Sequence, residues 1–194
     1  MATHRERMVR SAALLIRERG AQPTAIADVL AHSGAPRGSA YHYFPGGRTQ
    51  LLCEAIDYAR DWVAEQMIQA PDSVTLLDGL FDGYRDILRD SDFRAGCPVV
   101  AVTVEAGDPG KPEQSVAVIE RAAVAFTRWT GLIADRMTAD GISPERAADL
   151  ATLLMSSFEG AIVVARAARD LAPLDSVARQ MRALVQDELT KGAR

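Results

Sequence analysis

The chain has 194 residues, of which 48% are hydrophobic and 6% aromatic, and its formal net charge is −4. This length and balance predict a soluble protein with a sizeable core, built as one domain or as a small module joined to a larger one. The two cysteines make no disulfide framework or zinc motif, and no apolar run reaches the roughly 18 residues of a membrane span, so we expect a cytoplasmic protein without a metal site.

The first predicted helix runs from Thr3 to Arg19 and ends at Gly20. Its apolar residues recur at helical spacing, and its five arginines lie mostly off that stripe. These arginines suit either a solvated face or a set of contacts to the phosphates of a nucleic acid, and the pattern fits both interpretations.

A helix, a tight turn and a second helix are expected within residues 24–48. Thr24 can cap the first of these helices, Gly34 can adopt the positive φ that ends it, and Pro36 suits the first position of the next one. The second helix is expected at 37–44, before a Pro-Gly-Gly stop. This layout predicts a helix-turn-helix, whose second helix can lie in the DNA major groove.

The second helix of this motif carries residue types that suit DNA. Arg37 can fork onto a guanine edge or a phosphate, and Gly38 lets the backbone approach DNA closely. The competing interpretation is a helical hairpin inside an ordinary all-α domain. The candidate DNA contacts are Thr24, Arg37, Gly38, Ser39, Tyr41, His42, Tyr43 and Arg48, the last of them expected at a backbone phosphate.

The distribution of charge along the chain favours the DNA interpretation. Residues 1–52 hold seven arginines against three acidic residues, whereas the rest of the chain holds 15 basic and 23 acidic residues. A basic head on an acidic body is typical of a DNA-reading module attached to a body that repels DNA. We therefore expect a DNA-binding domain at 1–48 and a ligand-binding and dimerisation domain at 49–194.

The segment SGAPRGSAYHYFPGGRTQLL resembles the recognition segment of TetR-type transcriptional repressors, and its form is similar to the LmrA/YxaF-like branch. A second patch, Gly96-Cys97-Pro98-Val99 with Glu105 downstream, is similar to the ligand-domain segment of that branch. The chain departs from the family pattern at Leu15, Ala21 and Ala40, where bulkier side chains are usual. The resemblance implies a homodimer that is released from an operator by a small apolar or aromatic effector.

The rest of the chain predicts more helices, which gives an all-α fold of about nine helices: a three-helix N-terminal bundle and a helical body. A helix at 49–68 starts in the head and ends in the body, so tilting it would move the recognition helix. On the next helix, 73–89, aspartates recur every four residues; they could hold a metal, but interleaved arginines favour a self-compensated face. The remaining helices are expected at 99–104, 113–139, 144–168 and 174–189.

The last two predicted helices are apolar on more sides than one small body can cover. Pairing them with the same two helices of a second copy would build an intermolecular four-helix bundle, so they predict a homodimer. A two-fold dimer presents two recognition helices to double-stranded DNA, and its operator should therefore be an inverted repeat.

Aromatic and polar residues of the middle helices are the candidates for an effector pocket. At helical spacing such residues are also typical of a plain core, and it is the resemblance to TetR-type bodies that favours a cavity. The candidates are Trp62, Phe81, Tyr84, Cys97, Glu105, Arg121, Phe126, Trp129 and Phe158.

Two other functions compete with an effector-controlled repressor. An enzyme would need a nucleophile–base pair, a metal cluster or a phosphate cradle, and the three histidines all lie in the basic head without metal spacing, so we predict neither catalysis nor a cofactor. A DNA-binding regulator without a small effector would answer to a partner protein or to oxidation of a cysteine. If neither cysteine senses oxidation, we expect each of them to be a small buried apolar residue.

Overall fold

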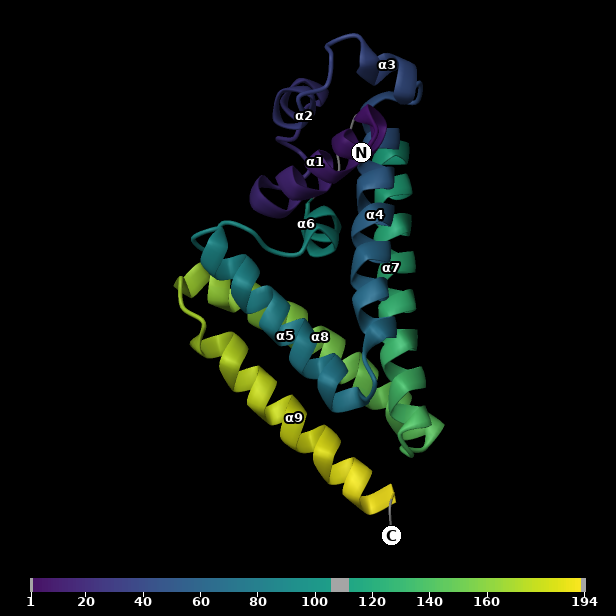
Figure 1. Cartoon of the computed structure of the whole chain (residues 1–194), viewed down its shortest axis with the longest axis vertical. Helices are drawn as coiled ribbons and strands as arrows, with labels where there is room; N and C mark the ends of the chain where they lie inside the picture. Colours follow the sequence, from purple (N-terminus) through teal and green to yellow (C-terminus); the bar gives the residue numbers. More distant parts are fainter. Residues whose placement is uncertain (1, 106–111, 193–194) are drawn as a thin grey trace. The chain divides into compact units, whose positions relative to one another are not determined.

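The computed structural model describes residues 2–105 and 112–192 (Figure 1). Over these residues the chain forms nine α-helices and no strand, which confirms the predicted all-α fold. The helices belong to two compact units. The first unit comprises Met1–Asp61 and Cys97–Ala125, and the second comprises Trp62–Gly96 and Phe126–Arg194.

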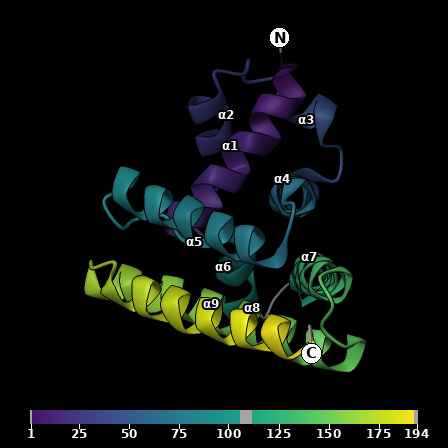
Figure 2. The same ribbon diagram turned by 60° about the horizontal axis from the view of Figure 1, so that its bottom comes forward.

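The first unit begins with three short helices, α1 (His4–Arg19), α2 (Ile26–Ser33) and α3 (Ser39–Tyr43). A reciprocal capping box opens α1, because the Thr3 hydroxyl accepts from the Glu6 N–H and the Glu6 carboxylate accepts from the Thr3 N–H. α1 lies between α2 and α3 and contacts both of them (Figure 2). These contacts build a small three-helix bundle around fully buried side chains such as Met8 and Ile16.

Three further helices contribute to the first unit: the start of α4 (Gly47–Gln69), α6 (Pro98–Val104) and the start of α7 (Pro112–Ala139). α6 follows Cys97, has Pro98 in its first turn and packs against α1. The first compact unit is therefore assembled from two stretches of sequence that are well separated along the chain.

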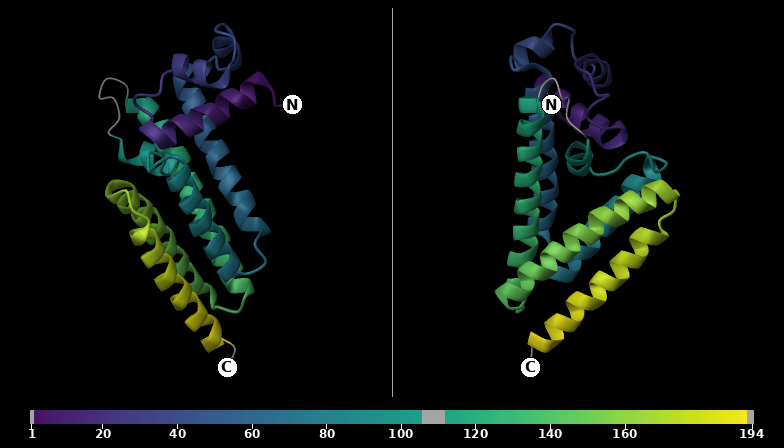
Figure 3. Two further views of the ribbon diagram at one scale, coloured as in Figure 1. Left: turned by 60° about the vertical axis from the view of Figure 1, so that its left-hand side comes forward. Right: turned by 180° about the vertical axis from the view of Figure 1, so that it is seen from behind.

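The second unit is built on α5 (Ser73–Asp90), α8 (Pro144–Ala168) and α9 (Ala172–Gly192), which contact one another. α8 and α9 form an antiparallel hairpin (Figure 3). In the core of this unit the Phe81 and Phe158 rings meet edge to face with centroids 5.0 Å apart, and both are almost completely buried. Among the described residues, α8 is the one helix long and apolar enough to cross a membrane, and half of its most apolar stretch is buried.

The row of aspartates on α5 is compensated by arginines. Asp82 pairs with Arg85, which also donates to Asp175 of α9 at 2.5 Å. Asp78 pairs with Arg182 of α9. The charges on this face of α5 are therefore neutralised by arginines, as the pattern predicted. Some of these arginine–aspartate pairs join α5 to α9, which the pattern did not predict.

Candidate nucleic-acid interface and ligand cavity

The turn between α2 and α3 differs from the predicted one in where the second helix begins. Gly34 ends α2 with φ +65°, in the left-handed region that favours glycine, as expected. Pro36 and the two residues after it form a turn, and the Ser39 hydroxyl donates to the Pro36 carbonyl at 2.6 Å. α3 therefore starts at Ser39 and has five residues, so the prediction that a helix spans 37–44 is wrong at its start.

α3 has one buried side and one exposed side. Ala40 and Phe44 are each 1% exposed, and the Arg5 guanidinium of α1 lies 5.6 Å from the centroid of the Phe44 ring. Tyr41 is 75% exposed, and its neighbour His42 is exposed as well. The buried side fixes α3 to the bundle, and the exposed side is free to contact another molecule.

Among the other predicted DNA contacts, Arg37 and Gly38 are exposed in the turn before α3, whereas Ser39 and Tyr43 are half-buried. Tyr43 packs edge to face against His42 at 5.2 Å. Four predicted contacts, two in the turn and two on α3, thus form one solvent-facing group: Arg37, Gly38, Tyr41 and His42.

Thr24 lies in the interior of the first unit and is 1% exposed. Its hydroxyl donates to the Gly20 carbonyl at 2.7 Å, so it is not at the surface where a DNA contact would form. The N-cap of α2 is Ala25, whose N–H donates to the Asp28 carboxylate at 3.0 Å. The prediction that Thr24 caps α2 is therefore wrong, because Asp28 reaches back to do so.

Arg48, at the start of α4, points back to the loop between α1 and α2. Its Nε donates to the Thr24 carbonyl at 2.9 Å, and its Nη2 donates to the carbonyls of Ala21 and Gln22. Glu105, which directly follows α6, accepts the Gln22 N–H at 2.7 Å. Arg48 and Glu105 together hold the loop between α1 and α2 in this structure. The phosphate contact that we expected for Arg48 stays a prediction.

We expect the Arg48→Ala substitution to lower the stability of the first unit by about 1.5–3 kcal/mol, because it removes charged hydrogen bonds and takes the Arg48 donor away from the carbonyl of the buried Thr24. Urea unfolding followed by circular dichroism measures this loss. Arg10→Ala, which removes an exposed arginine of α1, is the matched control and should leave stability unchanged. Unchanged stability in Arg48→Ala, together with weaker dependence of DNA binding on salt, would instead identify a phosphate contact.

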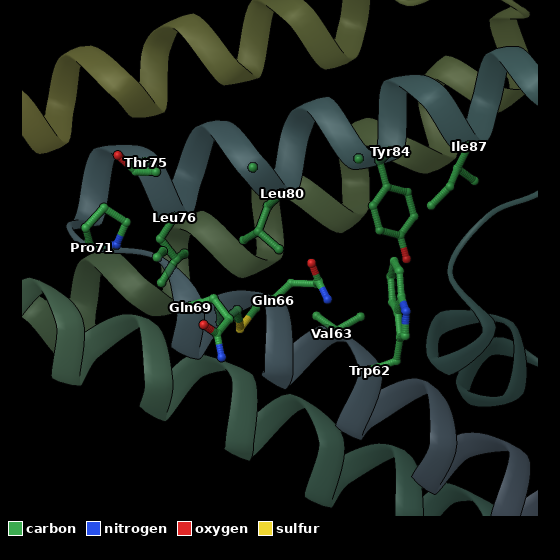
Figure 4. Close-up of a pocket in the computed structure, with 14 residues that line it drawn as sticks. Trp62, Val63, Gln66, Gln69, Pro71, Thr75, Leu76, Leu80, Tyr84 and Ile87 are labelled. Carbon is green, nitrogen blue, oxygen red and sulfur yellow. The ribbon is translucent and has the colours of Figure 1, made fainter.

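A cavity of about 300 Å³ lies in the second unit, between the C-terminal part of α4 and α5 (Figure 4). This volume is at the lower end of the range that small-molecule sites occupy. The wall is apolar apart from two carboxamides, Gln66 and Gln69, and the hydroxyls of Thr75 and Tyr84; no residue that lines it carries a charge. At one end the Tyr84 hydroxyl points toward the Trp62 indole (Figure 4).

Only Trp62 and Tyr84 of the nine predicted pocket residues line this cavity. Phe81 and Phe158 pack against each other in the core, as described above. Phe126 meets Trp129 edge to face at 5.8 Å, and Trp129 is 2% exposed. These four aromatic side chains line no part of the cavity.

The other three predicted pocket residues belong to the first unit. Glu105 binds the loop at Gln22, Arg121 pairs with Asp57 at 3.2 Å, and Cys97 is 5% exposed. Other residues that line the cavity were not predicted from the sequence, above all Gln66, Gln69, Gly79 and Gly83.

The environment of the cysteines disfavours oxidation. Burial raises the pKa of the Cys53 thiol; Arg121 nearby lowers it, and Asp57 and Glu54 raise it further. A raised pKa keeps the thiol protonated at neutral pH, and the protonated form is the unreactive one. Cys97 is buried, so an oxidant has little access to it.

Comparison with known proteins gives a consistent result. Residues 73–180 match the family model described as the C-terminal domain of LmrA/YxaF-like transcriptional regulators. The chain is 62% identical over 190 residues to Rv0196, an HTH-type transcriptional regulator of Mycobacterium tuberculosis (strain ATCC 25618 / H37Rv), with 98% of each chain covered. It is 27% identical to the HTH-type transcriptional regulator YxaF of Bacillus subtilis (strain 168), with 94% of this chain and 95% of the relative covered.

The solved structures agree in fold. A crystal structure of a TetR transcriptional regulator from Legionella pneumophila superposes with a TM-score of 0.79 at 18% identity, covering 95% of this chain and 98% of that one. At this identity the likeness concerns the arrangement of the helices and not the residues of the interface or the cavity.

Proposed function

This chain belongs to the LmrA/YxaF-like group of TetR-type helix-turn-helix transcriptional regulators, and from this membership we propose that it is a repressor released from an inverted-repeat operator by a small apolar or aromatic effector. The observation that carries the proposal is the solvent-facing group of Arg37, Gly38, Tyr41 and His42 on and before α3. The group combines a guanidinium, a hydroxyl and an imidazole with a glycine that admits close approach of a DNA strand.

Selection of binding sites from random duplex DNA tests the DNA-binding part of the proposal. The purified protein should enrich a single inverted repeat, because two recognition helices related by a two-fold axis read two half-sites. If nothing is enriched even at low salt, where phosphate contacts are strongest, α3 does not read DNA and the proposal fails.

The dimer that an inverted repeat requires is proposed to form through α8 and α9. α8 carries Leu153, Val163 and Val164 at 45–53% exposure, although most of its other apolar residues are buried. Leu153 and Val164 are eleven residues apart, so they lie on the same face of the helix, three turns apart. An exposed apolar face of this kind is stabilised when a second copy covers it.

A Leu153→Glu, Val164→Glu double variant is expected to be a monomer with its helical content unchanged. In a two-fold interface each substitution places carboxylates of both copies where they lose water without a counter-charge, which costs several kcal/mol. Size-exclusion chromatography with light scattering should give the mass of one chain, 20.9 kDa, in place of twice that value. Val124→Glu, on an exposed valine of α7, is the control, and a double variant that remains dimeric contradicts the α8–α9 interface.

The effector is proposed to bind in the cavity between α4 and α5. Because the cavity is apolar and uncharged, it favours a small greasy or aromatic molecule, and binding would shift a pre-existing equilibrium away from the DNA-binding form. An effector that binds the folded second unit should raise its melting temperature and release the operator.

The alternative is a DNA-binding regulator whose input is a protein partner or oxidation of a cysteine. The raised pKa of Cys53 and the burial of Cys97 weigh against the oxidation input. Release from DNA by peroxide in the wild type, but not in a Cys97→Ser variant, would support it. Under either version we propose a cytoplasmic protein with no catalytic role, in which double-stranded DNA is the partner of α3.

A further inference from the structure

The wall that α5 contributes to the cavity contains an unusual row of residues. Thr75, Gly79, Gly83 and Ile87 all line the cavity, and their spacing of four residues places them in one row along the helix. In the middle of this row two successive positions have no side chain. At about 1.5 Å per residue, Thr75 and Ile87 lie roughly 18 Å apart along the helix axis, and the two positions between them in this row are glycines.

Neither glycine is required by the backbone or by packing. Among the described residues both have ordinary helical backbone angles, and neither is one of the positive-φ glycines. A Cβ built at Gly79 or at Gly83 would meet no heavy atom within 4 Å. Alanine would therefore fit at both positions, and in a helix interior it is more stable than glycine. The fold of the isolated chain gives no reason for this loss of stability, whereas a molecule occupying the cavity would.

The chemistry of the remaining wall restricts what such a molecule can be. No side chain that is charged at neutral pH lines the cavity to compensate a charge, and Asp78 and Asp82 of α5 already have arginine partners. A charged ligand would therefore lose water without gaining a counter-ion. At one end of the cavity, Trp62 and Tyr84 offer the surfaces of their rings. The carboxamide of Gln66 can donate a hydrogen bond through its nitrogen and accept one through its oxygen.

We infer that Gly79 and Gly83 keep a slot open for a neutral, aromatic ligand and that these two positions set the size of ligand that the cavity accepts. The inference rests on the proposed function in one respect, namely that this ligand is the effector. The slot itself is a property of the second unit and can be tested in the absence of DNA.

Two fluorescent probes with the same ring skeleton test the charge requirement. N-phenyl-1-naphthylamine is aromatic and neutral, and 8-anilinonaphthalene-1-sulfonate differs from it by an added sulfonate. Titration of the full-length protein should show saturable binding of the neutral probe, one molecule per chain, and at least tenfold weaker binding of the sulfonate. Absent binding of the neutral probe, or equal binding of both probes, would overturn the inference.

A Gly79→Ala, Gly83→Ala double variant tests the role of the glycines. It should melt at a higher temperature than the wild type, because alanine favours the helix, and it should bind the neutral probe at least tenfold more weakly, because two methyl groups enter the slot. Gly131→Ala is the matched control: Gly131 lies within α7, has open space around it and does not line the cavity. This control should also have a higher melting temperature than the wild type, but it should bind the probe with the affinity of the wild type.

The result separates the slot from the regulatory function. Wild-type probe affinity in the double variant would show that the glycines do not shape the site and would overturn the inference. Loss of probe binding in the double variant alone supports the slot, whatever happens at the operator. If the protein binds the probe but binds no DNA, the inference about the slot is supported and the proposed repressor function is refuted.

Discussion

Replacing both Arg37 and Tyr41 by alanine is expected to abolish sequence-specific DNA binding and to leave the fold intact. A side chain that reads a base edge contributes about 1–3 kcal/mol of discrimination, so loss of both should weaken operator binding by roughly 2–6 kcal/mol. Because Arg37 is exposed and Tyr41 is 75% exposed, truncating them removes almost no buried surface. Fluorescence anisotropy with operator and scrambled duplexes at one salt concentration measures the effect.

The control for this variant is Arg179→Ala, which removes an exposed arginine from α9 in the second unit. It lowers the positive charge of the chain by the same amount and should leave operator affinity unchanged. An Arg37→Ala, Tyr41→Ala protein that still prefers the operator over scrambled DNA would show that α3 is not the recognition helix.

The Phe44→Ala substitution is expected to be among the most destabilising changes in the first unit, at about 3–5 kcal/mol. Phe44 is 1% exposed, directly follows α3 and lies beneath the Arg5 guanidinium. Its loss would leave a cavity under the recognition helix, so DNA binding should fail through unfolding and not through loss of a contact. This mechanism distinguishes the variant from the surface substitutions above.

The position of the tryptophans makes this distinction measurable. Both tryptophans of the chain, Trp62 and Trp129, belong to the second unit. In urea, Phe44→Ala should therefore shift the unfolding transition seen by circular dichroism to lower denaturant concentration more than the transition seen by tryptophan fluorescence. Phe44→Leu keeps most of the buried volume and should lie close to the wild type. A Phe44→Ala protein as stable as the wild type would contradict the packing of α3.

The sequence predicted best the elements whose ends carry local chemical signals. α8 begins at Pro144 and ends at Ala168, as predicted, because proline suits a first helical turn and a long apolar stripe follows. Gly34 likewise ends α2 as predicted. α3 was harder to predict, because the start of a five-residue helix depends on which of several adjacent polar residues closes the turn, and the Ser39 hydroxyl does so.

Most residues that line the cavity between α4 and α5 are not among the predicted pocket residues, for a physical reason. Periodicity identifies the apolar side of each helix, but it does not say which other helix covers that side. Phe81 and Phe158 satisfy each other in the core and are therefore not available to a ligand. Gly79 and Gly83, which keep the cavity open, have no side chain. They add nothing to the hydrophobic periodicity from which the pocket residues were predicted. The hydrogen bonds of Arg48 to the loop between α1 and α2 were not predicted either, since its carbonyl partners lie more than twenty residues away along the chain.

The contact between Glu105 and the loop after α1 has a consequence for building chimeric regulators. Glu105 accepts the Gln22 N–H, and its carboxylate lies beside Gly20, whose φ of +91° favours glycine. Transplanting residues 1–48 onto a foreign sensor domain would remove this carboxylate and expose the surface of α1 that α6 covers. A functional transplant should therefore carry α6 and Glu105 with it.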